Sequence, residues 1–112
     1  MTLKEIIGAV RRQIGDVDRQ LLTQYVNDVM IDLARDLRPT RTDCIRPYRW
    51  QLPRVPVEVI KITRGRTSAA VTYTYVPQLL RYDADIPDLP EWCHAALVTF
   101  TVQRYRATRD AA

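Results

Sequence analysis

Residues 2–37 read TLKEIIGAVRRQIGDVDRQLLTQYVNDVMIDLARDL and contain two helical patterns separated by a short break. Thr2 and Glu5 form a capping box, in which the threonine hydroxyl accepts from the Glu5 backbone N–H and the Glu5 carboxylate accepts from the Thr2 N–H. Gly15 ends the first predicted helix because glycine adopts a positive φ at little cost. The apolar residues at helical spacing are Leu3, Ile6, Ile7, Val10 and Ile14.

The second helix begins only a few residues later. Asp16 or Asp18 caps its start, and Pro39 stops it because proline clashes with a continuing helix. The connection is short, so residues 1–38 are predicted to form an antiparallel helix hairpin. The apolar stripe of the second helix contains Leu21, Leu22, Tyr25, Val26, Val29, Met30, Leu33, Ala34 and Leu37.

Residues 39–56 contain four prolines and are predicted to be an extended, proline-braced connection rather than a helix or a central strand. Within it, residues 46–50 read RPYRW and alternate arginine with aromatic side chains. These side chains could stack on nucleic-acid bases and contact phosphates. The favoured alternative is that Tyr48 and Trp50 cover the helix hairpin while Arg46 and Arg49 face water.

Residues 57–76 are predicted to form a β-hairpin, with Gly65 in the turn between two β-branched runs. In the first run the apolar positions shift from Val57 and Val59 to Ile60 and Ile62, which indicates a bulge or burial on both faces. A lone two-stranded hairpin is marginally stable in water, so it needs the helices or another subunit beneath it.

A third helix is predicted over residues 88–108, with Pro90 in its first turn and a short charged tail at 109–112. One face carries Trp92, Cys93, Ala96, Leu97 and Phe100. A second apolar face carries Ala95, Val98, Val102 and Tyr105 and is a candidate subunit interface. The alternative is an ordinary central helix that is covered on both sides within one chain.

The chain has 112 residues, which favours one domain with one core of α+β, mostly helical architecture. The third helix is expected to pack on the hairpin. No apolar run is long enough to span a membrane, and the amphipathic pattern with an early acidic residue, Glu5, argues against a signal peptide. His94 is the only histidine, and Cys44 and Cys93 are far apart in sequence. We therefore expect two free thiols, no metal, no cofactor and no enzymatic activity.

The net charge of +4 is unevenly distributed, because residues 44–66 alone carry six basic residues against Glu58. A local basic stripe suggests phosphate or an acidic partner, and the alternative is a solvated loop and hairpin. Major-groove recognition is disfavoured, because the outer face of the second helix carries Asp28, Asp32 and Asp36 rather than arginine or amide side chains.

Three stretches in this order resemble the head–tail adaptor (connector, or neck) proteins of tailed bacteriophages and prophages. They are Tyr25-Val26-Asn27-Asp28 on the second helix, YTYVPQLL at residues 73–80, and IPDLPEWCHAALV at residues 86–98. The last stretch is the most specific of the three, and the resemblance extends over nearly the whole chain.

The resemblance implies a structural virion protein that forms a ring, a dodecamer, between the portal and the tail. Its partners would be the portal protein, a tail or stopper protein, and DNA passing non-specifically through the channel, with no membrane. It would reside in the virion neck, and in the host cytoplasm during assembly. Candidate portal-docking residues are Arg104, Arg106 and Arg109, and Arg64 and Arg66 are candidates for channel or neighbour contact. The alternatives are a small nucleic-acid-binding module using Arg46, Arg49 and Trp50, or a stopper or tail-completion protein of the same neck.

Overall fold

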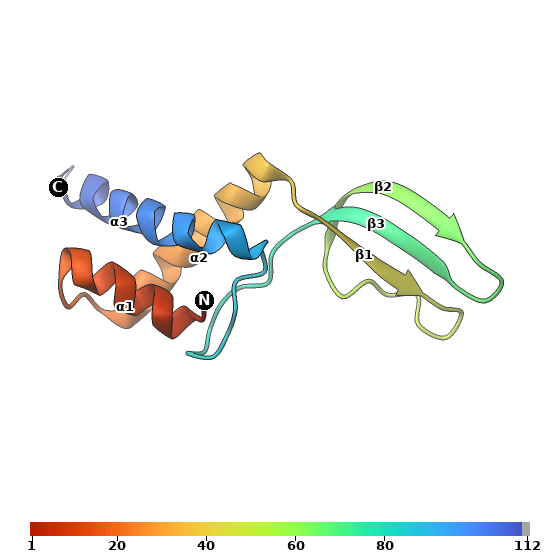
Figure 1. The fold of residues 1–112 in the computed structure, drawn as a ribbon, viewed down its shortest axis with the longest axis horizontal. Coiled ribbons are helices and arrows are strands. Elements are labelled where there is room, and N and C mark those ends of the chain that lie inside the picture. Colours follow the sequence, from red (N-terminus) through yellow and green to blue (C-terminus); the bar gives the residue numbers. More distant parts are fainter. Residues whose placement is uncertain (111–112) are drawn as a thin grey trace.

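The computed structural model describes residues 1–110 and has an α+β fold divided into two lobes (Figure 1). The helices gather at one end and a three-stranded antiparallel sheet projects from the other, so that the molecule is 56 Å long but only 25 Å by 22 Å across. The elements are α1 (Leu3–Ile14), α2 (Arg19–Leu37), β1 (Thr40–Ile45), β2 (Pro56–Arg64), β3 (Ala69–Tyr75), the 3₁₀ helix η1 (Glu91–Cys93) and α3 (His94–Asp110).

Local signals fix both ends of α1 as predicted. The Glu5 N–H donates to Thr2 Oγ1 at 3.3 Å and the Thr2 N–H donates to Glu5 Oε1 at 3.1 Å, which completes the capping box. Hydrogen bonds from the Thr2 N–H and then the Thr2 hydroxyl to the Glu5 carboxylate lower the pKa of Glu5. Gly15 follows the helix with φ +94°, a conformation that a side chain would strain.

Of the two predicted caps of α2, the structure uses Asp18, whose carboxylate accepts from the Leu21 N–H at 3.2 Å. The helix ends at Leu37, two residues before Pro39. Arg38 takes the left-handed conformation, and its N–H donates to the Ala34 carbonyl at 2.9 Å. It is the non-glycine residue with positive φ among residues 1–110, and it turns the chain from α2 into the sheet.

The C-terminal helix differs at both ends from the prediction of residues 88–108. Pro90 precedes the 3₁₀ turn η1, and α3 begins only at His94. Arg109 and Asp110 belong to α3, so the expectation of a tail from residue 109 was wrong for these two residues. The remainder of the predicted tail, residues 111–112, lies outside the described residues.

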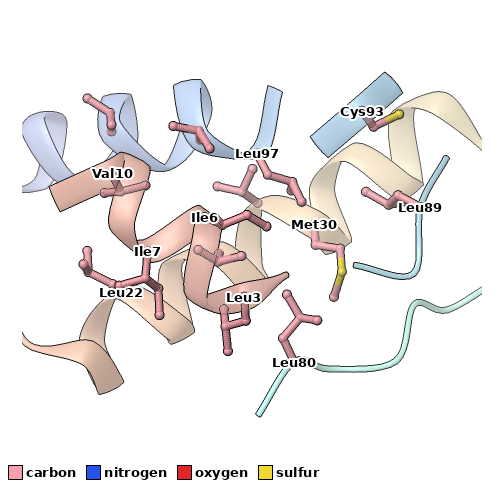
Figure 2. Close-up of a cluster of buried hydrophobic side chains, with 14 of the residues drawn as sticks. Leu3, Ile6, Ile7, Val10, Leu22, Met30, Leu80, Leu89, Cys93 and Leu97 are labelled. Atoms are coloured by element: carbon pink, nitrogen blue, oxygen red, sulfur yellow. The ribbon is translucent and has the colours of Figure 1, made fainter. Parts of the chain in front are cut away.

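The main hydrophobic core lies among the three helices, and α3 contacts both α1 and α2 (Figure 2). In Figure 1, α1 and α3 run away from the sheet and α2 runs back toward it. The loop between β3 and η1 adds Leu80 and Leu89 to this core. Its largest fully buried apolar side chains are Leu3, Ile6, Val10, Leu22, Val26, Met30 and Leu97.

Because α3 is covered on two sides, part of the predicted subunit interface was wrong. Val98 and Val102 are buried in the helical core of their own chain and present no surface to a neighbour. Ala95 is exposed, and Tyr105 is half-buried against Tyr25, with ring centroids 6.4 Å apart in an edge-to-face arrangement. For Val98 and Val102, the alternative of a central helix covered on both sides within one chain therefore holds.

The sheet has three strands in the order β1–β3–β2, so the predicted two-stranded hairpin was incomplete. The missing strand is β1, which occupies residues that we expected to be an irregular connection. It pairs with β3 from Thr40 opposite Thr74 to Ile45 opposite Ala69. β1 lies at an edge of the sheet, which is consistent with the expectation that residues 39–56 form no central strand. A register shift between Val59 and Lys61 confirms the predicted bulge, whereas burial of β2 on both faces was wrong.

The sheet has a small hydrophobic cluster of its own, where one main core was expected. Val71, Tyr73 and Tyr75 of β3 are buried, and Ile45 and Leu52 pack against them. These residues share one face of the sheet, since alternate residues of a strand point to the same side. The third strand and this cluster, rather than the helices, supply the support that a lone hairpin lacks.

Candidate functional site

The projecting sheet carries the candidate functional surfaces, and β2 is its most exposed element. Every residue of β2 from Pro56 to Arg64 is exposed, including Val57, Val59, Ile60 and Ile62. One edge of β2 pairs with β3, and no strand among residues 1–110 covers the other edge. A long exposed edge strand with apolar side chains is a ready template for pairing with another chain.

The far end of the sheet brings four arginines from two loops together. The last residues of β1 and β2, Ile45 and Arg64, both pair with Ala69 at the start of β3. The turn after β1 therefore lies beside the hairpin that joins β2 to β3, at the end of the molecule away from the helices (Figure 1). A shallow pocket between the loops is lined by Arg46, Pro47, Tyr48, Thr67 and Ser68. We call this region the distal tip and define it as residues 46–50 and 64–68.

Tyr48 and Trp50 do not cover the helices, so the favoured interpretation of RPYRW was wrong. Tyr48 is 79% exposed and Trp50 is 63% exposed at the distal tip. Tyr48 lies in a tight turn in which Arg46 and Arg49 exchange backbone hydrogen bonds, and Trp50 directly follows this turn. Arg46 Nη1 also donates to the Tyr48 hydroxyl at 3.0 Å, and this bond raises the pKa of Arg46.

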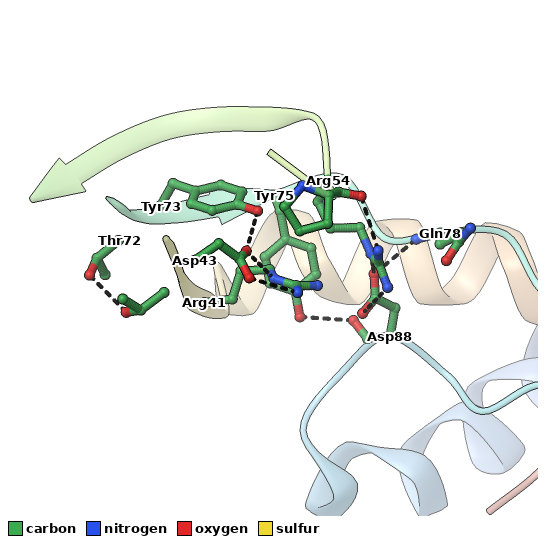
Figure 3. Close-up of polar contacts among 10 residues, drawn as sticks. Arg41, Asp43, Arg54, Thr72, Tyr73, Tyr75, Gln78 and Asp88 are labelled. Carbon is green, nitrogen blue, oxygen red and sulfur yellow. Dashed lines mark hydrogen bonds and ion pairs between the residues drawn. The ribbon is translucent and has the colours of Figure 1, made fainter. Parts of the chain in front are cut away.

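A polar cluster joins the sheet to the helical lobe at Asp88 (Figure 3). The Asp88 carboxylate forms a partly buried ion pair with Arg54 and accepts from the Gln78 N–H at 3.1 Å. The Tyr75 hydroxyl donates to the Asp88 carbonyl at 2.9 Å. Burial raises the pKa of Tyr75. Through Arg54 and Tyr75, these contacts tie the sheet to the segment that returns from β3 to the helices.

A second polar cluster lies on the buried face of the sheet. Arg41 forms a two-point ion pair with Asp43, and the Tyr73 hydroxyl donates to Asp43 Oδ2 at 2.6 Å (Figure 3). Hydrogen bonding by Arg41 holds the pKa of Asp43 below its usual value. Burial, followed by the hydrogen bond to Asp43, raises the pKa of Tyr73 to about 12. Every member has a partner, so the cluster stabilises the sheet.

The predicted docking arginines of α3 divide into paired and free groups. Arg104 forms an ion pair with Asp32 of α2 at 2.5 Å, and Arg106 Nη2 reaches the Gln13 carbonyl at 3.4 Å. Arg109 is exposed near the end of α3. Arg64 and Arg66 are exposed and lie at the distal tip with Arg46 and Arg49.

His94 and Cys93 are buried, whereas Cys44 is exposed. His94 is buried, with Nδ1 3.0 Å from the terminal nitrogen of Met1 and Nε2 3.2 Å from the Leu89 carbonyl. Both cysteines are free, with Cys44 exposed and Cys93 buried. Among residues 1–110, no cluster of three or more His, Cys, Asp or Glu side chains is placed to hold a metal ion. Over the same residues, no helix has the length and apolar character to cross a membrane.

Comparisons of the sequence with protein-family models and with curated proteins, and of the fold with solved structures, found no match.

Two important residues were missed by reasoning from the sequence. Asp88 appeared only as the start of the predicted third helix and within the stretch at residues 86–98, although it links the sheet to the segment that returns to the helices. Asn27 appeared only within the stretch Tyr25-Val26-Asn27-Asp28. In the structure its side chain hydrogen-bonds to the backbone of Leu80, which is distant in sequence. In both cases the partners are distant in sequence, and spacing within a helix or loop carries no signal for them.

Proposed function

We propose that the protein is a structural ring subunit of the head–tail adaptor kind, placed between the portal and the tail of a phage particle. One observation carries this proposal: β2 is exposed along its whole length and bears four exposed apolar side chains on a sheet that projects away from the core. Isolated soluble domains usually blunt or cover such a strand. A second copy of the chain is the occupant that we propose for it.

The two free edges of the sheet support a ring rather than a twofold dimer. β1 and β2 are unlike strands on opposite edges of one sheet. Pairing of β2 in one copy with β1 in the next is a head-to-tail contact, and contacts of this kind form a ring when the rotation from copy to copy closes. Val98 and Val102 of α3 are buried within their own chain. The proposal therefore uses the sheet, rather than α3, as the subunit contact.

The other lobe is left free to meet the portal and the tail. Arg106 and Arg109 near the end of α3 remain candidates for portal docking, whereas Arg104 is already paired with Asp32. Catalysis has no part in the proposal. The proposed site of action is the virion neck, with assembly in the host cytoplasm.

The proposal is tested by co-sedimentation of the purified protein with its cognate portal ring, followed by imaging of the complex. A saturable ring stacked on the narrow end of the portal is the expected result. No binding to an intact portal contradicts the adaptor assignment. Binding to an adaptor ring instead of the portal would identify the chain as a stopper.

A pair of matched variants tests the proposed subunit contact separately. Val57→Lys with Ile60→Lys places two charges on exposed positions of β2, so the monomer should still fold. The control is Ile86→Lys with Tyr82→Lys, which alters exposed side chains of the loop before α3. We expect the β2 variant to lose ring formation on the portal while the control retains it. Equal assembly of both variants would exclude β2 as the contact.

A further inference from the structure

The distal tip concentrates positive charge. Residues 39–76 carry seven basic and two acidic residues, a net charge of +5, whereas the rest of the chain has a net charge of −1. Asp43 is held by Arg41 and Tyr73, and Glu58 pairs with Thr74 near the helical end of the sheet. The distal tip itself contains no carboxylate. Its potential is therefore strongly positive and is not cancelled locally.

None of the four arginines at the distal tip forms an ion pair within residues 1–110. The other arginines in the middle of the sequence, Arg41 and Arg54, are both paired with aspartates outside the distal tip. The arginines of this lobe are thus separated into two that are bound to aspartates and stabilise it, and four that are unpaired at its end.

Exposed aromatic side chains accompany this charge. Tyr48 lies within the arginine-bearing turn and Trp50 directly follows it, and both are more than half exposed. The Arg46–Tyr48 hydrogen bond and the backbone bonds between Arg46 and Arg49 order the turn without burying either ring. Large aromatic residues usually bury their surface, so two exposed rings in and directly after an ordered turn mark a contact surface.

We propose that the distal tip binds single-stranded nucleic acid without sequence preference. Arginines on both loops would neutralise successive phosphates, and Trp50 and Tyr48 would stack on unpaired bases. Positive charge alone is enough to bind the phosphates of either a duplex or a single strand. The exposed aromatic rings add affinity for a single strand, because its bases are free to stack on them. An acidic protein would use the arginines and gain less from the two rings. The inference does not rest on the head–tail proposal, because it concerns the isolated chain.

The test is fluorescence anisotropy of labelled oligo(dT) titrated with the full chain over a range of salt concentrations. Four phosphate contacts predict a slope of log K against log salt of about −3, at roughly −0.7 per contact for a single strand. Arg46→Ser with Arg49→Ser, or Arg64→Ser with Arg66→Ser, removes two contacts. Each pair should weaken binding about twentyfold at 0.1 M salt and halve the slope.

The matched control is Arg12→Ser with Arg35→Ser, which makes the same charge change at exposed positions of the helical lobe. It should leave the slope unchanged. Trp50→Ala should weaken binding by about fivefold to a hundredfold at every salt concentration, because stacking is not electrostatic. In a Trp92→Phe background, oligo(dT) should quench the emission of Trp50.

Three results would overturn the proposal. The first is no salt-dependent binding of oligo(dT) by a folded protein. The second is binding that Arg12→Ser with Arg35→Ser weakens as much as the tip variants do. The third is tighter binding of duplex DNA or polyglutamate than of oligo(dT), with no effect of Trp50→Ala. Because no portal is present in the assay, none of these results bears on ring assembly.

Discussion

The Asn27 side chain holds the backbone of Leu80 at two points. Asn27 Nδ2 donates to the Leu80 carbonyl at 3.0 Å, and the Leu80 N–H donates to Asn27 Oδ1 at 2.8 Å. This pairing, between residues 53 positions apart, resembles one rung of a β-ladder. It fixes the chain that returns from the sheet onto α2 and so places the Leu80 side chain in the helical core.

Asn27→Ala should lower the free energy of unfolding by about 1–3 kcal/mol, because two partly buried backbone groups lose their partner. Asn27→Asp should destabilise as well, since its carboxylate would face the Leu80 carbonyl. Urea unfolding followed by circular dichroism measures both effects. Gln24→Ala, at an exposed position of α2, is the control and should change stability by less than about 0.5 kcal/mol. An effect of Asn27→Ala no larger than the control would disprove the role of the pairing.

The Arg41–Asp43 pair should make the sheet sensitive to acid. The folded-state pKa of Asp43 lies below its unfolded value, mainly through the hydrogen bond from Arg41. Its stabilisation is therefore present above the unfolded pKa and is lost as pH falls through the folded pKa. Asp43→Asn should be less stable than wild type at pH 7, and the difference should shrink below about pH 4. Urea unfolding at several pH values measures the difference in free energy of unfolding. The control is Asp28→Asn, at an exposed position of α2, whose difference from wild type should not shrink in the same way as the pH falls.

Tyr73 should limit stability at the alkaline end. Its folded-state pKa is raised to about 12 from an ordinary value of 10.0, because the ring is buried and its hydroxyl donates to Asp43. A raised pKa means that stabilisation is complete below pH 10.0 and is lost as pH rises toward 12. Absorbance titration should show a phenol that ionises late and is missing in Tyr73→Phe. If wild type and Tyr73→Phe titrate with the same midpoints, the hydroxyl is not buried as described.

Local sequence signals predicted the helices well, because caps and stops act within a few residues. Thr2, Glu5, Asp18 and Pro39 all act at the predicted ends of α1 and α2. β1 was missed because residues 40–45 contain one large apolar side chain, Ile45, and their strand character depends on pairing with β3 about thirty residues away. Prolines on both sides of β1 favoured an irregular connection.

The surfaces could be predicted less well than the elements. Periodicity identified two apolar faces on α3, but it could not show that α1 and α2 cover Val98 and Val102 between them. Similarly, the sequence showed a basic middle segment without separating its arginines. Arg41 and Arg54 form ion pairs with Asp43 and Asp88. The register of the sheet places the four unpaired arginines together at the distal tip.

Thr101 is the site at which a substitution should increase stability. It is fully buried in α3, and its hydroxyl has no hydrogen-bond partner among residues 1–110. Thr101→Val keeps the shape and removes the unpaired polar group, so the free energy of unfolding should rise by about 1 kcal/mol. Thr99→Val on the exposed side of the same helix is the control. Thermal unfolding compares the two, and a loss of stability in Thr101→Val would mean that its hydroxyl is bonded.

The two cysteines should react at very different rates with a thiol reagent such as DTNB. Cys44 is exposed on β1, whereas Cys93 is buried in the helical core, where burial raises its pKa and suppresses the reactive thiolate. The native protein should lose one thiol quickly and the second only on unfolding. Cys44→Ser should remove the fast phase and Cys93→Ser should retain it. Equal rates in the native state would show that the core around Cys93 opens easily. In the proposed ring, β1 is paired with a neighbouring β2, so assembly on the portal should slow the Cys44 reaction.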